Sequence, residues 1–306
     1  MLLTARLDHG IISFYSGEFV TARNVLEQRY ALDDPADRTA VRAATATVSP
    51  LDAYVAMLVY IATSLAYLGY VDAARARVRE ALSEAKWLEH VYTLTHASLY
   101  AAWVECAVGS PYNARAHAER VVSLANEHGF PFERAWGLIY RGWSISALGE
   151  PEEGYAQVAR GLSMHRATGC VLCTAFALTL LAGACGRLGK TTEGLSYLTE
   201  AEQLIETTND AFHEAELHRV RGDLLNTVRD LAGAERSYQQ AIAVAKRQSA
   251  KMFELRAARS LARLWRDQGK RGEARDLLAP VYCWFTEGFD TRDLKEARAL
   301  LDELAA

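Results

Sequence analysis

Four arginines near the end of the chain have the spacing of a single helix face. They follow one another at intervals of three, four and three residues: Arg256, Arg259, Arg263 and Arg266. Guanidinium groups pair with carboxylates and phosphates through parallel hydrogen bonds, so this row predicts a site for an acidic segment. The alternative is a solvent-exposed helix face whose charge is partly neutralised by Glu216, Asp223 and Asp267.

Aromatic residues form a second group of candidates, in the middle of the chain. They are Tyr100, Trp103, Trp136, Tyr140 and Trp143. Large rings provide anchoring area for a ligand, but the same rings can simply fill the space between neighbouring helices. Arg219 and Asp223 occupy the equivalent helix face between this group and the arginine row. The candidates together describe a groove with an aromatic centre and a cationic end.

The segment Gly189-Lys190-Thr191 has the end of a phosphate-binding loop without its beginning. That loop requires a glycine five residues before Gly189, where this chain has Ala184. It also follows a β-strand, whereas a helix is predicted here. We therefore interpret these residues as a turn between two helices.

The cysteine and histidine pairs also lack the further ligands or the spacing that a metal site requires. Cys170 and Cys173 have no second pair, whereas a zinc site needs four converging ligands. His213 and His218 are five residues apart, about 140° around a helix, whereas a spacing of four places both on one face. No nucleophile with a neighbouring base stands out either. We expect no catalytic residue, no metal and no cofactor.

A forty-residue period of small residues reveals the elements that carry these candidates. The turn positions of six successive units are Gly69, Gly109, Gly149, Gly189, Arg229 and Gly269. Ala or Gly stands seven residues before and five residues after each of them, as in Gly142 and Gly154. Small residues on both sides of a turn let two antiparallel helices cross closely. The period predicts an all-α fold, a right-handed superhelical solenoid of about seven helical hairpins.

We expect a single solenoid domain over residues 1–306. A degenerate first repeat occupies 1–30, a loop 31–50, six forty-residue repeats 51–288 and a capping helix 290–305. Left-handed C-caps are expected where second helices end: Gly129, Gly169 and Asn209.

Composition and charge exclude several classes of function. The net charge of −4 argues against a general nucleic-acid-binding surface. Five cysteines without a disulfide framework suit a reducing compartment. The uncharged stretches 53–71 and 170–186 are long enough to suggest membrane spans, but both lie in phase with the repeat as first helices. We expect a cytoplasmic protein that binds neither nucleic acid nor membrane.

The pattern resembles the tetratricopeptide repeat (TPR), most closely in the unit around Arg229. The matching residues are Gly222, Leu231, Ala234, Tyr238 and Ala241. Whole segments, 126–144, 214–225 and 261–304, are similar to the C-terminal repeat region of large bacterial signalling proteins. In that family a class III adenylate/guanylate cyclase domain, or a LuxR-type regulator, is joined to a predicted STAND-type ATPase and then to these repeats.

This resemblance implies a non-catalytic sensor or scaffold, and it carries no catalytic residue to this chain. We expect the chain to dock a partner in its concave groove. The partner is a protein or peptide, acidic if the arginine row receives it, or the cyclase and NTPase domains of the same signalling system. The alternative is a small-ligand sensor that binds an effector in an aromatic pocket of the third and fourth units.

Overall fold

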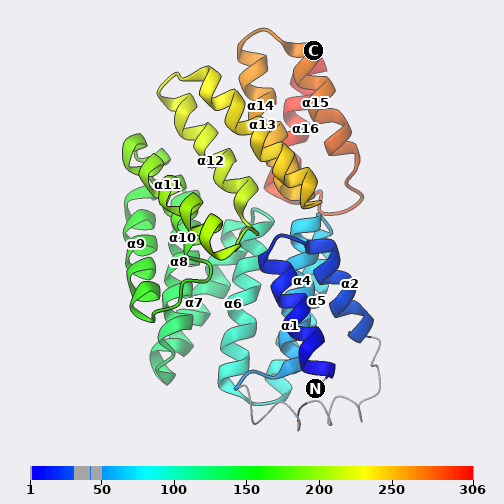
Figure 1. The fold of residues 1–306 in the computed structure, drawn as a ribbon, viewed down its shortest axis with the longest axis vertical. Coiled ribbons are helices and arrows are strands. Elements are labelled where there is room, and N and C mark those ends of the chain that lie inside the picture. The colour runs from blue at the N-terminus through cyan, green and yellow to red at the C-terminus, as the bar shows by residue number, and fades with distance from the viewer. Residues whose placement is uncertain (1, 31–41, 43–49, 306) are drawn as a thin grey trace.

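A computed structural model describes residues 2–30, 42 and 50–305, and every regular element among them is an α-helix (Figure 1). The helices are α1 (Leu2–Tyr15), α2 (Phe19–Tyr30), α4 (Ala53–Leu68), α5 (Val71–Trp87), α6 (Val91–Ala107), α7 (Pro111–His128), α8 (Pro131–Ala147), α9 (Pro151–Ala167), α10 (Thr174–Arg187), α11 (Thr191–Thr208), α12 (Glu214–Thr227), α13 (Leu231–Arg247), α14 (Lys251–Asp267), α15 (Arg271–Cys283) and α16 (Arg292–Ala305). The loop expected over 31–50 lies almost entirely outside the described residues.

The turns between the two helices of each hairpin fall where the period predicts them. All six turn positions have a left-handed backbone, with φ from 63° at Arg229 to 107° at Gly149. Five of the six are glycine, which adopts this conformation without a steric penalty. The expected C-caps are left-handed too, with φ of 73° at Gly129, 76° at Gly169 and 57° at Asn209.

The small residues mark the closest approach of the two helices in a hairpin. A Cβ atom added to Gly154 in α9 would lie 2.6 Å from the carbonyl oxygen of Gly142 in α8. Ala62 and Ala74, the equivalent pair in the first hairpin after α2, are fully buried. The close crossing predicted from the sequence is confirmed.

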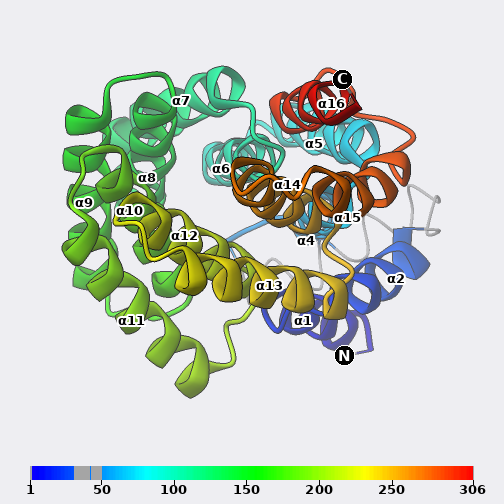
Figure 2. The same ribbon diagram turned by 90° about the horizontal axis from the view of Figure 1, so that it is seen from above.

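The helices form two layers around a curved axis. Seen from above, the first helices of the hairpins (α4, α6, α8, α10, α12 and α14) lie on the inside of the curve, with the second helices outside them (Figure 2). Helix α4 is buried along almost its whole length, which explains why the stretch 53–71 is uncharged. None of the helices in the described part of the chain combines the length and apolar character needed to cross a membrane.

Both ends of the chain contact segments that are distant from them in the sequence. In the segment between α15 and α16, a Glu287 carboxylate oxygen accepts hydrogen bonds from the backbone N–H groups of Asp72 (2.9 Å) and Ala73 (3.3 Å), at the start of α5. At the other end, the carbonyl oxygen of Tyr15 accepts from the N–H groups of Ala211 and Phe212. The Glu287 contacts place the C-terminal helices beside α5, and α14 also packs against α4 (Figure 2).

Candidate functional site

A cavity of about 280 Å³ lies between the inner helices. Side chains of α4, α6, α8, α10, α12, α14 and α16 line it, so its shape depends on most of the solenoid. Four carboxylates face it: Glu216, Asp223, Asp293 and Glu296. Six arginines face it as well: Arg187, Arg219, Arg256, Arg259, Arg263 and Arg292. The lining therefore carries two more positive than negative charges among these residues.

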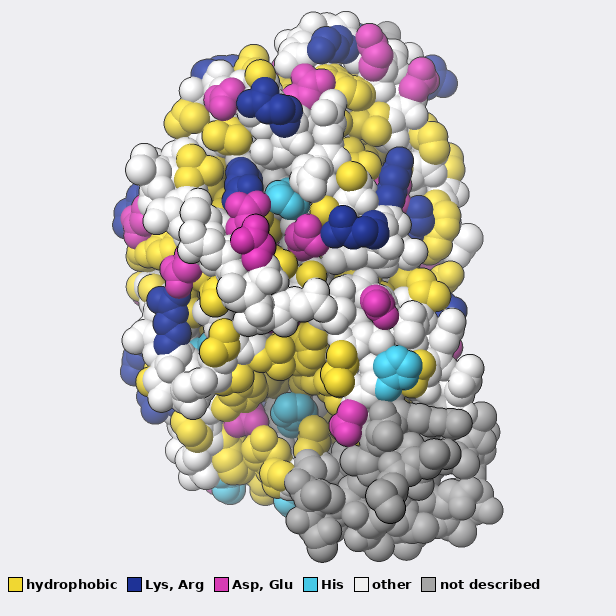
Figure 3. Space-filling model, in the orientation of Figure 1, with side chains coloured by type: hydrophobic (Ala, Val, Ile, Leu, Met, Phe, Trp, Pro, Cys, Tyr) yellow, Lys and Arg dark blue, Asp and Glu magenta, His cyan; other side chains and the backbone are white. Residues whose placement is uncertain are grey.

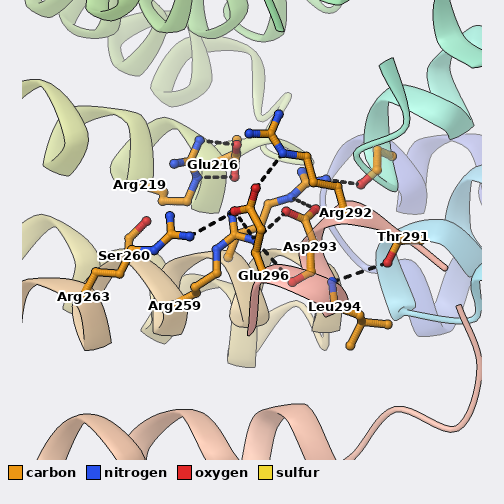
Figure 4. Close-up of polar contacts among 12 residues, drawn as sticks. Glu216, Arg219, Arg259, Ser260, Arg263, Thr291, Arg292, Asp293, Leu294 and Glu296 are labelled. Carbon is orange, nitrogen blue, oxygen red and sulfur yellow. Dashed lines mark hydrogen bonds and ion pairs between the residues drawn. The ribbon is translucent and has the colours of Figure 1, made fainter. Parts of the chain in front are cut away.

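The arginine row faces carboxylates of the chain's own last helix (Figure 4). Arg256 and Arg259 both bind Asp293, at 2.6 and 3.0 Å, and Arg263 binds Glu296 at 3.1 Å. Burial alone raises the pKa of the Asp293 carboxyl, but the two guanidinium groups overcome this and hold it below its usual range. The row thus joins two successive first helices, α14 and α16.

Arg266 lies apart from the other three arginines of the row. It is not among the residues that line the cavity. It pairs instead with Asp267 at 2.8 Å and with Glu303 at 3.0 Å, both carboxylates more than half exposed. The structure therefore brings three of the four row arginines to the cavity.

Arg219 and Asp223, the other predicted polar pair, also face the cavity. Arg219 binds Glu216 at 2.6 Å and forms a second ion pair with Asp223, which in turn accepts a 2.8 Å hydrogen bond from the Tyr238 hydroxyl. Burial of Glu216 opposes its ionisation, yet Arg219 and Arg256 lower its pKa to about 2. This carboxylate is therefore charged at neutral pH.

The predicted aromatic centre is mostly part of the core. Tyr100, Trp103, Trp136 and Tyr140 are each no more than 4% exposed. The Trp103 ring lies 5.3 Å from Phe212 and 5.8 Å from Phe176 between centroids, and its indole N–H donates to the Tyr67 hydroxyl at 2.9 Å. Only Trp143 of the predicted five lines the charged cavity. In this structure the other four rings fill space between inner helices, the alternative left open by the sequence.

Two residues of the cavity were missed by sequence reasoning. Arg187, the last residue of α10, is exposed in the cavity and forms no ion pair with any described carboxylate. His213, just before α12, is buried, and neither ring nitrogen has a hydrogen-bond partner among the described residues. Burial lowers the pKa of His213 to about 3. The predicted helix face of α10 ends one position before Arg187, and that of α12 begins after His213. The periodic pattern therefore gave no signal for either residue.

The segments that suggested catalysis or metal binding have structural roles. Gly189 and Lys190 form the turn between α10 and α11, and the Lys190 ammonium lies 4.4 Å from the centroid of the Tyr155 ring. The backbone N–H of Cys173 donates to the buried Asp210 carboxylate. Over residues 2–30, 42 and 50–305, no three His, Cys, Asp or Glu side chains are placed to hold a metal ion.

The outer surface carries charges of both signs. On the face shown in Figure 3, Lys and Arg side chains lie next to Asp and Glu side chains over the upper part, and hydrophobic side chains gather in the lower part. A nucleic-acid-binding surface usually concentrates basic side chains on one face or stripe. This face has no such stripe among its described residues.

Comparisons with known proteins identify the fold. No family model matches the chain, and no curated protein matches it in sequence. The structure of NprR in complex with its cognate peptide NprX is similar, with a TM-score of 0.62 and 11% identity, over 99% of this chain and 82% of that one. A Rap protein complexed with Competence and Sporulation Factor has a TM-score of 0.56 and 12% identity, over 99% and 97% of the two chains.

A tetratricopeptide repeat protein from Parabacteroides merdae is also similar, with a TM-score of 0.50 and 13% identity, over 99% of both chains. At these identities the similarity shows the fold alone. The chain is an all-α solenoid of TPR-like helical hairpins.

Proposed function

We propose that this chain is a non-catalytic protein-interaction module that docks a segment of a partner protein at the charged cavity on its inner face. The observation that carries the proposal is the cavity itself. It is lined by side chains of seven inner helices and has an excess of positive charge. A segment bound there would contact most of the repeats, so its binding would be coupled to the curvature of the whole solenoid.

Two of the similar structures support a peptide or protein as the occupant. The NprR structure contains a cognate peptide, and the Rap structure contains Competence and Sporulation Factor. Because a shared fold does not fix a shared ligand, this support is an analogy between folds. The excess positive charge of the cavity favours an acidic segment.

The wider context we propose is a bacterial signalling system in the cytoplasm. The segments 126–144, 214–225 and 261–304 resemble the repeat region that follows cyclase and STAND-type ATPase domains, so those domains are candidate partners. In such a system the module would act as sensor or scaffold, and any catalytic step would belong to the partner. The net charge of −4 favours protein partners over nucleic acid.

A small-molecule effector is the second candidate occupant. One observation favours it: a cavity of about 280 Å³ is close in size to the smallest pockets that bind drug-sized ligands. Its location would be the charged cavity beside Trp143, because the remaining predicted aromatic residues are buried against one another.

Binding assays on the purified chain test the proposal. The chain would be screened against a display library of random nonapeptides and against a panel of small metabolites, with binding followed by tryptophan fluorescence, since Trp143 lines the cavity. We expect selected peptides to bind and to protect the cavity segments from hydrogen exchange. A response to metabolites without any peptide binding would reject the docking function in favour of effector sensing.

A further inference from the structure

Arg187 differs from the other arginines around the cavity. Each of the other five forms at least one ion pair within the chain, through Glu216, Asp223, Asp293 or Glu296. The Arg187 side chain makes two long hydrogen bonds from one nitrogen, to the Ser146 hydroxyl at 3.4 Å and to the Gly183 carbonyl at 3.3 Å. Since a guanidinium has five N–H donors, most of them remain without a described partner.

The electrostatic environment of Arg187 favours a negative charge beside it. Arg187 is open to the cavity, but the protein atoms around it displace part of its hydration. This desolvation and the neighbouring guanidinium groups of Arg219 and Arg292 lower the pKa of Arg187, and Asp223 and Glu216 partly offset them. Those two carboxylates are engaged by Arg219. An anion placed next to Arg187 would therefore relieve repulsion among three positive side chains.

His213 is a second residue of the cavity whose polar atoms have no partner within the described chain. The imidazole is held by the rings of Phe176 and Phe253, whose centroids lie 4.3 and 5.1 Å away. Both ring nitrogens lack a hydrogen-bond partner among the described residues, although the residue is only 6% exposed and lines the cavity. Buried polar atoms in folded proteins are nearly always hydrogen-bonded to protein or to ordered water, so a water molecule or a polar group of a bound segment would satisfy them.

The composition of the cavity distinguishes between anions. Trp143, Ala147 and Leu180 form an apolar part of the lining, suited to the methylene groups of a side chain. A doubly charged phosphate would lie close to the carboxylates of Glu216 and Asp223, whereas the carboxylate of a peptide side chain carries about half that charge. An acidic side chain of a peptide matches both the apolar and the charged parts.

We propose that Arg187 anchors the docked segment by binding the carboxylate of an aspartate or glutamate side chain within the cavity. The inference rests on the proposed function, because it names the chemistry of the segment that docks there. It assigns the acidic partner to Arg187 instead of the arginine row, whose guanidinium groups already bind carboxylates of α16.

The test begins with peptides selected on the wild-type chain from the random nonapeptide library. We expect them to share an acidic position, and its change to Asn or Gln should weaken binding to the wild type by about tenfold. In Arg187→Gln the acidic peptide and its amide counterpart should bind almost equally. Arg275→Gln, an exposed arginine of α15 outside the cavity, is the matched control and should keep the wild-type preference.

Other outcomes separate a failure of the Arg187 assignment from a failure of the docking function. Peptides that bind without an acidic position, or whose preference survives in Arg187→Gln, would overturn the inference and leave the docking function in place. If no peptide is enriched, the docking function itself fails. Inorganic phosphate that shifts the Arg187 side-chain NMR signal, when no acidic peptide does so, would reassign the site to phosphate. Thermal unfolding of each variant shows whether it is folded, and Arg187→Lys should retain part of the preference.

Discussion

The Arg256 guanidinium donates a hydrogen bond of 2.8 Å to the carbonyl oxygen of Ala107, although 149 residues separate them along the chain. Ala107 is the last residue of α6, and Arg256 lies on α14 and also binds Asp293 of α16 at 2.6 Å. One buried side chain therefore joins three inner helices across the superhelix. A positively charged guanidinium at a helix C-terminus also interacts favourably with the negative end of the helix dipole.

Replacing Arg256 is expected to destabilise the protein strongly. Arg256→Gln removes the contact with Ala107 and leaves Arg259 as the one ion-pair partner of the buried Asp293 among the described residues. By comparison with broken buried ion pairs, we expect a loss of about 3–5 kcal/mol in the free energy of unfolding. Urea unfolding measures the change. Arg298→Gln breaks an exposed pair with Asp302 and should cost less than about 1 kcal/mol. Equal losses of stability in the two variants would show that the Arg256 contacts between α6, α14 and α16 do not stabilise the solenoid.

The close crossing of α8 and α9 can be tested with two glycines. Gly154→Ala would place a Cβ atom 2.6 Å from the Gly142 carbonyl oxygen and 2.5 Å from the Ser146 side chain, so the helices must separate. We expect a loss of about 1–3 kcal/mol in the free energy of unfolding. In Gly272→Ala, within α15, the new methyl group meets no atom within 4 Å, and a gain of up to about 1 kcal/mol is expected. A neutral Gly154→Ala would contradict the crossing geometry.

His213 should make the stability of the protein sensitive to mild acid. Burial lowers the pKa of His213 to about 3 in the folded state, from an ordinary value of 6.5. Between these values the unfolded chain binds a proton that the folded chain does not, so stability falls as pH falls below 6.5, by up to about 1.4 kcal/mol per pH unit.

The matched variants are His213→Leu and His128→Gln, the second at an exposed position near the end of α7. Urea unfolding at about pH 7.5 and pH 5.5 should show a smaller acid-induced loss for His213→Leu than for the wild type. His128→Gln should retain the wild-type loss. If all three proteins lose the same stability, His213 is not the group responsible.

Arg263 should strengthen the binding of an acidic segment at the cavity through electrostatic attraction. Its side chain is 44% exposed, compared with 11% for Arg259, although both bind Glu296. Arg263→Glu should lower the affinity of the chain for an acidic peptide and should make that affinity less dependent on salt concentration, while leaving the fold intact. Arg259→Glu should mainly reduce stability, because it places a charge next to the buried Asp293. Unchanged salt dependence in Arg263→Glu would exclude a role in binding.

The predicted groove residues show which features of side-chain placement a periodic pattern predicts. Residues with the correct phase on a first helix, such as Arg219, Asp223 and Arg263, do face the cavity. The same phase placed Trp103 and Trp136 on the inner face, but the neighbouring inner helices cover both rings. The position of a residue within the repeat gives the direction in which its side chain leaves its own helix. It contains no information on the distance to the next helix.

By itself, the sequence determined the repeating elements of this protein. Left-handed turns such as Gly149 and close crossings such as Gly142 with Gly154 depend on residues within one hairpin, so a forty-residue period is enough to find them. Only the tertiary structure decided that Arg256 reaches Ala107 and that Arg187 and His213 face one cavity. Those relationships depend on the curvature summed over successive hairpins, and small differences in packing at each interface set that curvature.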